Sequence, residues 1–325
     1  MVKLKKFLKP YKDAGAFHSL LAPHRFIDDC VFLTKSNQLG VVLTAEGIDY
    51  ECLTEATLES HTKRAAAAWR SFDERFRLYQ YAVKQDRAPI DQRIDYQNAA
   101  VWKTIRDRRD HLQSKAAGLY TLRLVYVLVY EQATLTKQNA LKRTVSTKKL
   151  LRIVTDELER NRAILLGRVQ SFQRTLDDLL GLTLLRKREA FAFFRLLTNL
   201  DPSIAAAEQL KYDGHIDFYM ASSTLACTGD GIRIGQAQLE VLSLKEPPHS
   251  TFPNILRDLL ALETNFILCS EFKRVLNEKA VTTIRAAQNH FHWSQWVADI
   301  PSILSMIVNR GDQSEPQGEA SPRPD

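Results

Sequence analysis

The sequence lacks a hydrophobic run long enough to cross a membrane as a helix. Its longest uninterrupted apolar stretch, residues 124–130, is about a third of the roughly 20 residues that a membrane-spanning helix needs. The start of the chain also lacks the apolar core, about 7–15 residues long, of a secretory signal peptide. We therefore expect a cytoplasmic protein.

Cysteine is scarce, and its four positions form no CxxC pair. Cys30, Cys52, Cys227 and Cys269 are far apart and lie in apolar or strand-like stretches. This pattern indicates buried thiols in a reducing compartment and argues against a disulfide framework.

The usual catalytic motifs are missing as well. No GxxxxGK[ST] phosphate loop and no GxSxG nucleophile elbow occur in the 325 residues. Gly229, Gly231 and Gly235 have the spacing GxGxxxG, but strand-like sequence lies on both sides, so a hairpin turn is expected there. The absence of a phosphate loop excludes a conventional nucleotide site of that kind in this sequence.

Metal-ligand patterns are weak. Asp213, His215 and Asp217 alternate, so on a strand they would share one face, and strand-like sequence is expected at 215–220. No further convergent ligand is identifiable, and a solvated strand face is the simpler interpretation. We therefore predict no catalytic, cofactor-binding or metal residues.

What the sequence does have is the composition of a globular protein with a basic balance. Hydrophobic residues make up 45% and charged residues 26%, which excludes wholesale disorder. The formal net charge of +7 fits an anionic partner, either nucleic acid or a membrane surface, without requiring one.

Two basic segments are candidate contacts for such partners, one at the start of the chain and one at residues 142–152. The first could hold the chain peripherally at a membrane, although a solvated tail is the alternative. The second could follow a phosphate backbone, but no RNP, zinc-finger or helix-turn-helix motif supports sequence-specific binding. The candidate membrane contacts are Lys3, Lys5, Lys6, Phe7 and Lys9, and the candidate anion contacts are Lys142, Arg143, Lys148, Lys149 and Arg152.

Periodicity predicts an α+β fold: an N-terminal mixed αβ domain with a small sheet, then a helix-rich mixed domain, with no RecA-like motor. The strand at 119–130 is apolar on both faces, so we expect it to be central, with Leu124 and Leu128 in the core. A long helix is expected at 148–180. The predicted parts are a basic segment at 1–20, the αβ domain at 21–135, a linker at 136–147, the central domain at 148–310 and a disordered tail at 311–325.

Several segments, taken in order, carry a family resemblance. LAPHRFIDDCVFLTKSNQLGVVLTAEGIDYECL contains a hairpin ending in Gly47-Ile48-Asp49, and RFRLYQYAVKQ and the aromatic-rich YTLRLVYVLVYE follow it. LLGLTLLRKREAFAFFRLLTNLDP and ALETNFILCSEFKRVLNEKA come later. Over about residues 20–300, this order resembles the CagE/TrbE/VirB family of bacterial type IV secretion and conjugal transfer ATPases.

The resemblance implies a role in assembly. Members of this family continue into a motor domain with Walker motifs that uses ATP and magnesium. This sequence resembles the N-terminal and central region alone, so no catalytic residue is carried over, no cofactor is expected here, and we expect no ATP hydrolysis. The implied partners are inner-membrane and channel components at the cytoplasmic face. The resemblance is also compatible with an oligomer. The alternative is a basic cytoplasmic protein that binds nucleic acid non-specifically.

Overall fold

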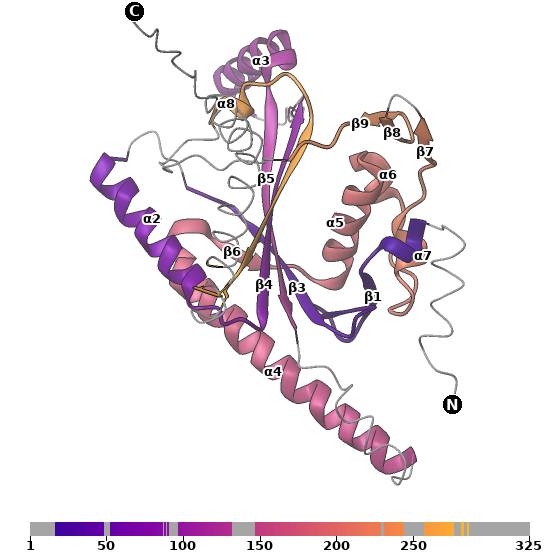
Figure 1. Ribbon diagram of the computed structural model, residues 1–325. Coiled ribbons are helices and arrows are strands. Elements are labelled where there is room, and N and C mark those ends of the chain that lie inside the picture. The colour runs from indigo at the N-terminus through magenta and orange to yellow at the C-terminus, as the bar shows by residue number, and fades with distance from the viewer. Residues whose placement is uncertain are drawn as a thin grey trace, which may run out of the picture. The chain divides into compact units, whose positions relative to one another are not determined.

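The computed structural model describes residues 17–48, 53–86, 88, 90, 97–131, 147–228, 231–243, 257–275, 281, 282 and 285. The chain divides into two units, Met1–Arg274 and Val275–Asp325, and the fold described below belongs to the first. The predicted α+β class is confirmed, because an antiparallel sheet is combined with helices that cover it (Figure 1).

The main sheet has seven strands in the order β1-β2-β3-β5-β4-β10, with β6 also paired to β3. Every pairing in it is antiparallel. Because β2 pairs with the start of β3 and β6 with its end, these two short strands share one edge of β3. The strands are β1 (Pro23–Phe26), β2 (Phe32–Thr34), β3 (Leu39–Ala45), β4 (Phe76–Asp86), β5 (Tyr120–Tyr130), β6 (Leu182–Leu184) and β10 (Phe266–Lys273).

The helices begin where the sequence supplies caps. Thr54 and Asn98 accept hydrogen bonds from the first turns of α2 and α3, and Asp201 caps α6 with Pro202 at its first position. The described helices are η1 (Phe17–Leu20), α2 (Glu55–Arg70), α3 (Ala99–Ser114), η2 (Ala116–Gly118), α4 (Thr147–Leu180), α5 (Lys187–Asn199), α6 (Pro202–Ala207), α7 (Asp217–Met220) and α8 (Arg257–Leu260).

A second, three-stranded sheet consists of β7 (Leu225–Thr228), β8 (Gly231–Ile234) and β9 (Ala237–Leu239). Thr228 pairs with Gly231 across antiparallel strands, so the predicted hairpin at the glycine-rich stretch is confirmed. Gly235 has φ +58 in the turn that follows, a left-handed conformation that glycine adopts without steric cost.

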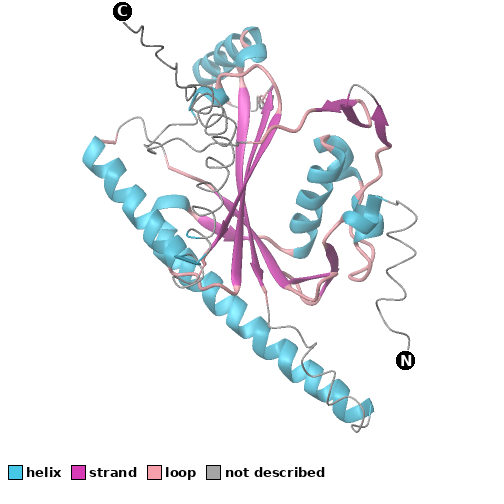
Figure 2. Ribbon diagram, in the orientation of Figure 1, coloured by secondary structure: helices cyan, strands magenta, loops and turns pink. Residues whose placement is uncertain are grey.

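Helices cover both faces of the main sheet (Figure 2). Helices α2 and α4 lie on one face, and α5 to α7 lie on the other. The central strand β5 shows how the sequence produces this arrangement, because its alternate side chains enter different cores. Tyr126, Leu128 and Tyr130 pack with α2 and α4, whereas Val125, Val127 and Val129 pack with α5.

The predicted central position of β5 is confirmed, with one correction to its extent. Leu128 is fully buried, but Leu124 is only half-buried, and Tyr120 and Leu122 are exposed. The first half of β5 therefore runs beyond the layer that the helices cover.

Two further predictions are wrong. Residues 215–220 are not a strand, since His215 has φ 55 and the helix α7 follows it. The helix forms because Ile216, Asp217 and Met220, which are all buried, recur at helical spacing. The prediction of buried thiols is wrong for Cys227 and Cys269, which are exposed because they lie on β7 and β10, the edge strands of their sheets. Cys30 is half-buried, and Cys52 lies outside the described residues.

Strands from both sides of residues 136–147 join the main sheet, since β6 and β10 pair with β3 and β4. The domain limits predicted at this segment stay a prediction. Among the described residues, no helix combines the length and the hydrophobicity that crossing a bilayer requires.

Candidate functional site

Helix α4 packs on the sheet with only part of its length. At 34 residues it is about 50 Å long. Every side chain in residues 152–156 is exposed, and in Figure 1 this end of the helix runs past the end of the sheet. Among the α4 side chains that the structure describes, those fully in the core are C-terminal to this stretch: Leu165, Val169, Phe172, Leu176 and Leu179.

The exposed stretch, residues 152–156 of α4, is called the α4 projection below. It carries two adjacent apolar side chains, Ile153 and Val154, each 38% exposed. Val154 belongs to the apolar stripe that the sequence pattern predicts, but the stripe reaches the core only from about Leu158 onward. The α4 projection therefore offers apolar surface that nothing in the described residues covers.

Three of the candidate anion contacts lie in the N-terminal part of α4, in or next to the α4 projection. Arg152 is an exposed residue of the α4 projection, and Lys148 and Lys149 lie in the first turn of the same helix. Lys142 and Arg143 lie outside the described residues, so the cluster is placed only in part. The candidate membrane contacts, Lys3, Lys5, Lys6, Phe7 and Lys9, also lie outside the described residues and stay a prediction.

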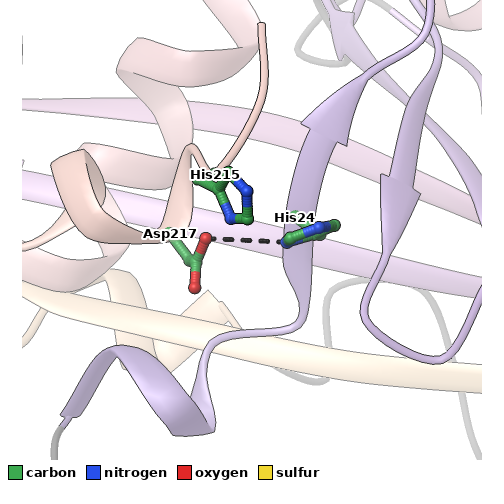
Figure 3. Close-up of side chains that lie close together, drawn as sticks. All are labelled: His24, His215 and Asp217. Atoms are coloured by element: carbon green, nitrogen blue, oxygen red, sulfur yellow. Dashed lines mark ion pairs between the residues drawn. The ribbon is translucent and has the colours of Figure 1, made fainter. Parts of the chain in front are cut away.

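A second site is a group of histidine and aspartate side chains at the edge of the main sheet (Figure 3). His24 comes from β1, His215 from the turn before α7, and Asp217 from the first position of α7. One potential ligand atom from each lies within 4.8 Å of the others. His24 Nδ1 lies 3.8 Å from Asp217 Oδ1, and the two imidazole rings meet edge-on with centroids 4.8 Å apart.

Backbone pairing along β1 brings these residues together. The Phe26 N–H donates to the Asp213 carbonyl at 2.7 Å, and the Ile216 N–H donates to the His24 carbonyl at 3.0 Å. The left-handed φ of 55 at His215 then turns the chain into α7. As a result, an imidazole and a carboxylate from one segment face an imidazole from the edge strand.

The two carboxylate oxygens of Asp217 differ in their partners: Oδ2 pairs with a lysine, and Oδ1 accepts no hydrogen bond among the described residues. The residue is 3% exposed, and its Oδ2 lies 2.8 Å from Lys35 Nζ. Burial lowers the pKa of His24; His215, Lys35 and Arg25 lower it further, while Asp217 opposes the shift. The lowered pKa favours the neutral imidazole of His24, which is the form that binds metals.

The sequence pattern identified part of this group. His215 and Asp217 belong to the alternating motif, but Asp213 points elsewhere and pairs with Lys187 at 3.0 Å. His24 was missed, because nothing in its local sequence reports the backbone pairing that brings the two distant segments together.

A third polar group, around Arg195, is structural. Its guanidinium is 1% exposed and donates to the Ile204 carbonyl at 2.8 Å and to Ser222 Oγ at 2.9 Å, with a further bond to the Tyr219 carbonyl. These bonds link α5 to α6, to α7 and to the segment after it, and they compensate the buried guanidinium charge. Since Nε also donates, to Ala205, all three guanidinium nitrogens are engaged within the fold.

Comparison with family models matches residues 30–137 to the N-terminal domain of the type IV secretion system ATPase VirB4/TrbE. The matched region contains β2, β3, α2, β4, α3 and β5, so it includes the central strand of the sheet. Comparison of the chain with curated proteins finds no match. The family resemblance stated from the sequence is confirmed for this region: residues 30–137 are similar to the N-terminal domain of the VirB4/TrbE ATPases of type IV secretion systems.

Proposed function

We propose that this chain is a docking module of a type IV secretion or conjugal transfer ATPase, which binds inner-membrane and channel components at the cytoplasmic face. The match of residues 30–137 to the VirB4/TrbE N-terminal domain carries the proposal. On this proposal the described unit binds proteins and transforms no substrate.

Chemistry supports a role apart from ATP hydrolysis. Phosphoryl transfer needs a cradle of backbone N–H groups, a lysine on the terminal phosphates and ligands for magnesium. The 325 residues contain no GxxxxGK[ST] loop that would supply them together. We assign ATP and magnesium to the motor region of the family and not to the residues of this chain.

The α4 projection is the surface that we assign to the protein partner. Ile153 and Val154 are exposed although isoleucine and valine are among the residues most often buried in proteins. A partner that covers both side chains would gain hydrophobic free energy, and exposed Arg152 beside them would add charge complementarity to an acidic partner surface.

The proposal is tested by producing the chain in cells that carry an intact conjugation apparatus. A docking module without a motor should occupy motor positions and lower the transfer frequency, by about tenfold or more at high expression. The double variant Ile153→Asp, Val154→Asp should restore transfer, because two charges replace the apolar contact. Val101→Asp on α3 is the matched control, since Val101 is 42% exposed but lies on another helix, and it should inhibit transfer like the parent.

Three outcomes would contradict the proposal. The first is normal transfer despite high levels of folded chain, and the second is magnesium-dependent ATP turnover by the chain that persists through stringent purification. The third is tight DNA binding whose affinity falls steeply with salt, because many phosphate contacts release counterions. That result would support the alternative function, non-specific nucleic-acid binding.

A further inference from the structure

We propose that His24, His215 and Asp217 bind a divalent transition-metal ion, with zinc as the ion that suits them best. The three side chains supply two imidazole nitrogens and one carboxylate oxygen, and their candidate ligand atoms lie within 4.8 Å of one another. Two histidines and one carboxylate are a donor set that zinc accepts, with an open fourth position for water. This inference is independent of the docking function.

The distances require only small movements. In a tetrahedral zinc site with bonds of about 2.0–2.1 Å, ligand atoms lie roughly 3.4 Å apart. His24 Nδ1 and Asp217 Oδ1 are 3.8 Å apart, so this pair is already close to the required separation. His215 is exposed, and rotation of its side chain can close the remaining gap without moving the core.

Two buried atoms indicate that this space suits a ligand. His24 Nδ1 and Asp217 Oδ1 are both buried, and neither has a hydrogen-bond partner among the described residues. Buried polar atoms are normally satisfied, so such a facing pair of a nitrogen and a carboxylate oxygen needs an explanation. A metal ion between them satisfies both atoms at once.

The surroundings resemble a ligand shell. Lys35 Nζ holds Asp217 Oδ2 at 2.8 Å, which leaves Oδ1 to face His24. Metal-binding carboxylates are commonly oriented by such a hydrogen bond on the second oxygen. The ammonium charge also repels a cation, so we expect micromolar affinity rather than the much tighter binding of a closed structural zinc site.

The backbone conformation of His215 allows a variant that removes a ligand and keeps the local fold. Because φ is 55 there, glycine fits this position without strain, and His215→Gly removes one ligand while keeping the turn. His24→Gln removes the second histidine ligand and keeps a polar side chain of similar length. His111→Ala on α3 is the control, because His111 is exposed and takes no part in the group.

The experiment measures the melting temperature of the tag-free full chain with and without zinc chloride, and the visible absorption of the cobalt(II) form. At zinc concentrations about 100-fold above the dissociation constant, the parent and His111→Ala should melt about 3–8 °C higher than without metal. His215→Gly and His24→Gln should melt normally without metal, show at most a quarter of this rise, and lose the cobalt absorption of a histidine-bound ion.

Exposed thiols such as Cys227 and Cys269 bind zinc too, but every variant retains them, so their contribution cancels in the comparison. The proposal is overturned if zinc at millimolar concentration leaves the parent unchanged. It is also overturned if both ligand variants respond to zinc as strongly as His111→Ala does. Either result would mean that these three side chains do not bind a metal ion.

Discussion

Leu124 and Leu128 lie on the same face of β5, four positions apart, yet their surroundings differ. Leu128 is fully buried, whereas Leu124 is half-buried at the margin of the core. The partners of Leu124 on the neighbouring strands are Ala45 and Ala82, whose small side chains cover little of it.

We therefore expect Leu128→Ala to lower the free energy of unfolding by about 2–5 kcal/mol, because it leaves a cavity in the core. Leu124→Ala should cost less than half as much, since solvent already reaches that side chain. Urea titration monitored by circular dichroism gives both values. Equal losses for the two variants would show that the different burial of Leu124 and Leu128 does not govern their contributions to stability.

The histidine and aspartate group shows where reasoning from sequence ends. His215 and Asp217 could be singled out, because they are near neighbours with suitable side chains. Their orientation could not, because a strand was expected and the left-handed residue turns them differently. His24 could not be found at all, since its place depends on backbone bonds between β1 and residues 213–216.

Helix α4 was predictable in its bounds but not in its packing. The spacing of three and four between apolar residues marks a helix from its start to Gly181, where a left-handed φ of +54 ends it. The same spacing makes Val154 and Leu165 look alike, although one is exposed and the other is fully buried. Which part of a stripe meets a sheet is decided by tertiary contacts.

Two glycines of this region should respond in opposite ways to alanine. A Cβ added at Gly167, within α4, meets nothing within 4 Å, so Gly167→Ala should stabilise the protein by about 0.5–1 kcal/mol. At Gly181 the added Cβ would lie 3.4 Å from Glu46 and the left-handed backbone disfavours alanine, so Gly181→Ala should destabilise by about 1–2 kcal/mol. Thermal unfolding of the two variants tests the pair, and a shift of the same sign in both would contradict it.

The segment that matches the family model is covered by residues outside it. On one face of β5 lie Leu165 and Phe172 of α4, and on the other lie Phe191 and Phe194 of α5. Without α4 and α5, the β5 side chains that pack on α5 would be exposed to water, and on the other face α2 alone of these three helices would remain.

We expect the isolated segment 30–137 to unfold without a cooperative transition in urea, whereas residues 17–275 should unfold in one transition. The physical reason is that the apolar side chains of β5 pack with α4 on one face and with α5 on the other, and the isolated segment lacks both helices. A cooperative transition in the isolated segment would instead support the predicted domain limit at 136–147. The pairing of β10 with β4 across that limit could not be predicted from the sequence, because the paired residues, 266–273 and 77–84, are far apart in the chain and no local pattern links them.

The pairing of β4 with β10 also has a consequence during translation. Lys84 on β4 donates to the carbonyl of Thr264, just before β10, and the two residues are 180 positions apart. At about 5–20 residues per second, a ribosome needs on the order of 10–40 s to make the intervening chain. During that interval one edge of β4 has no strand beside it, so the nascent protein presents a template for β-aggregation that only late synthesis removes.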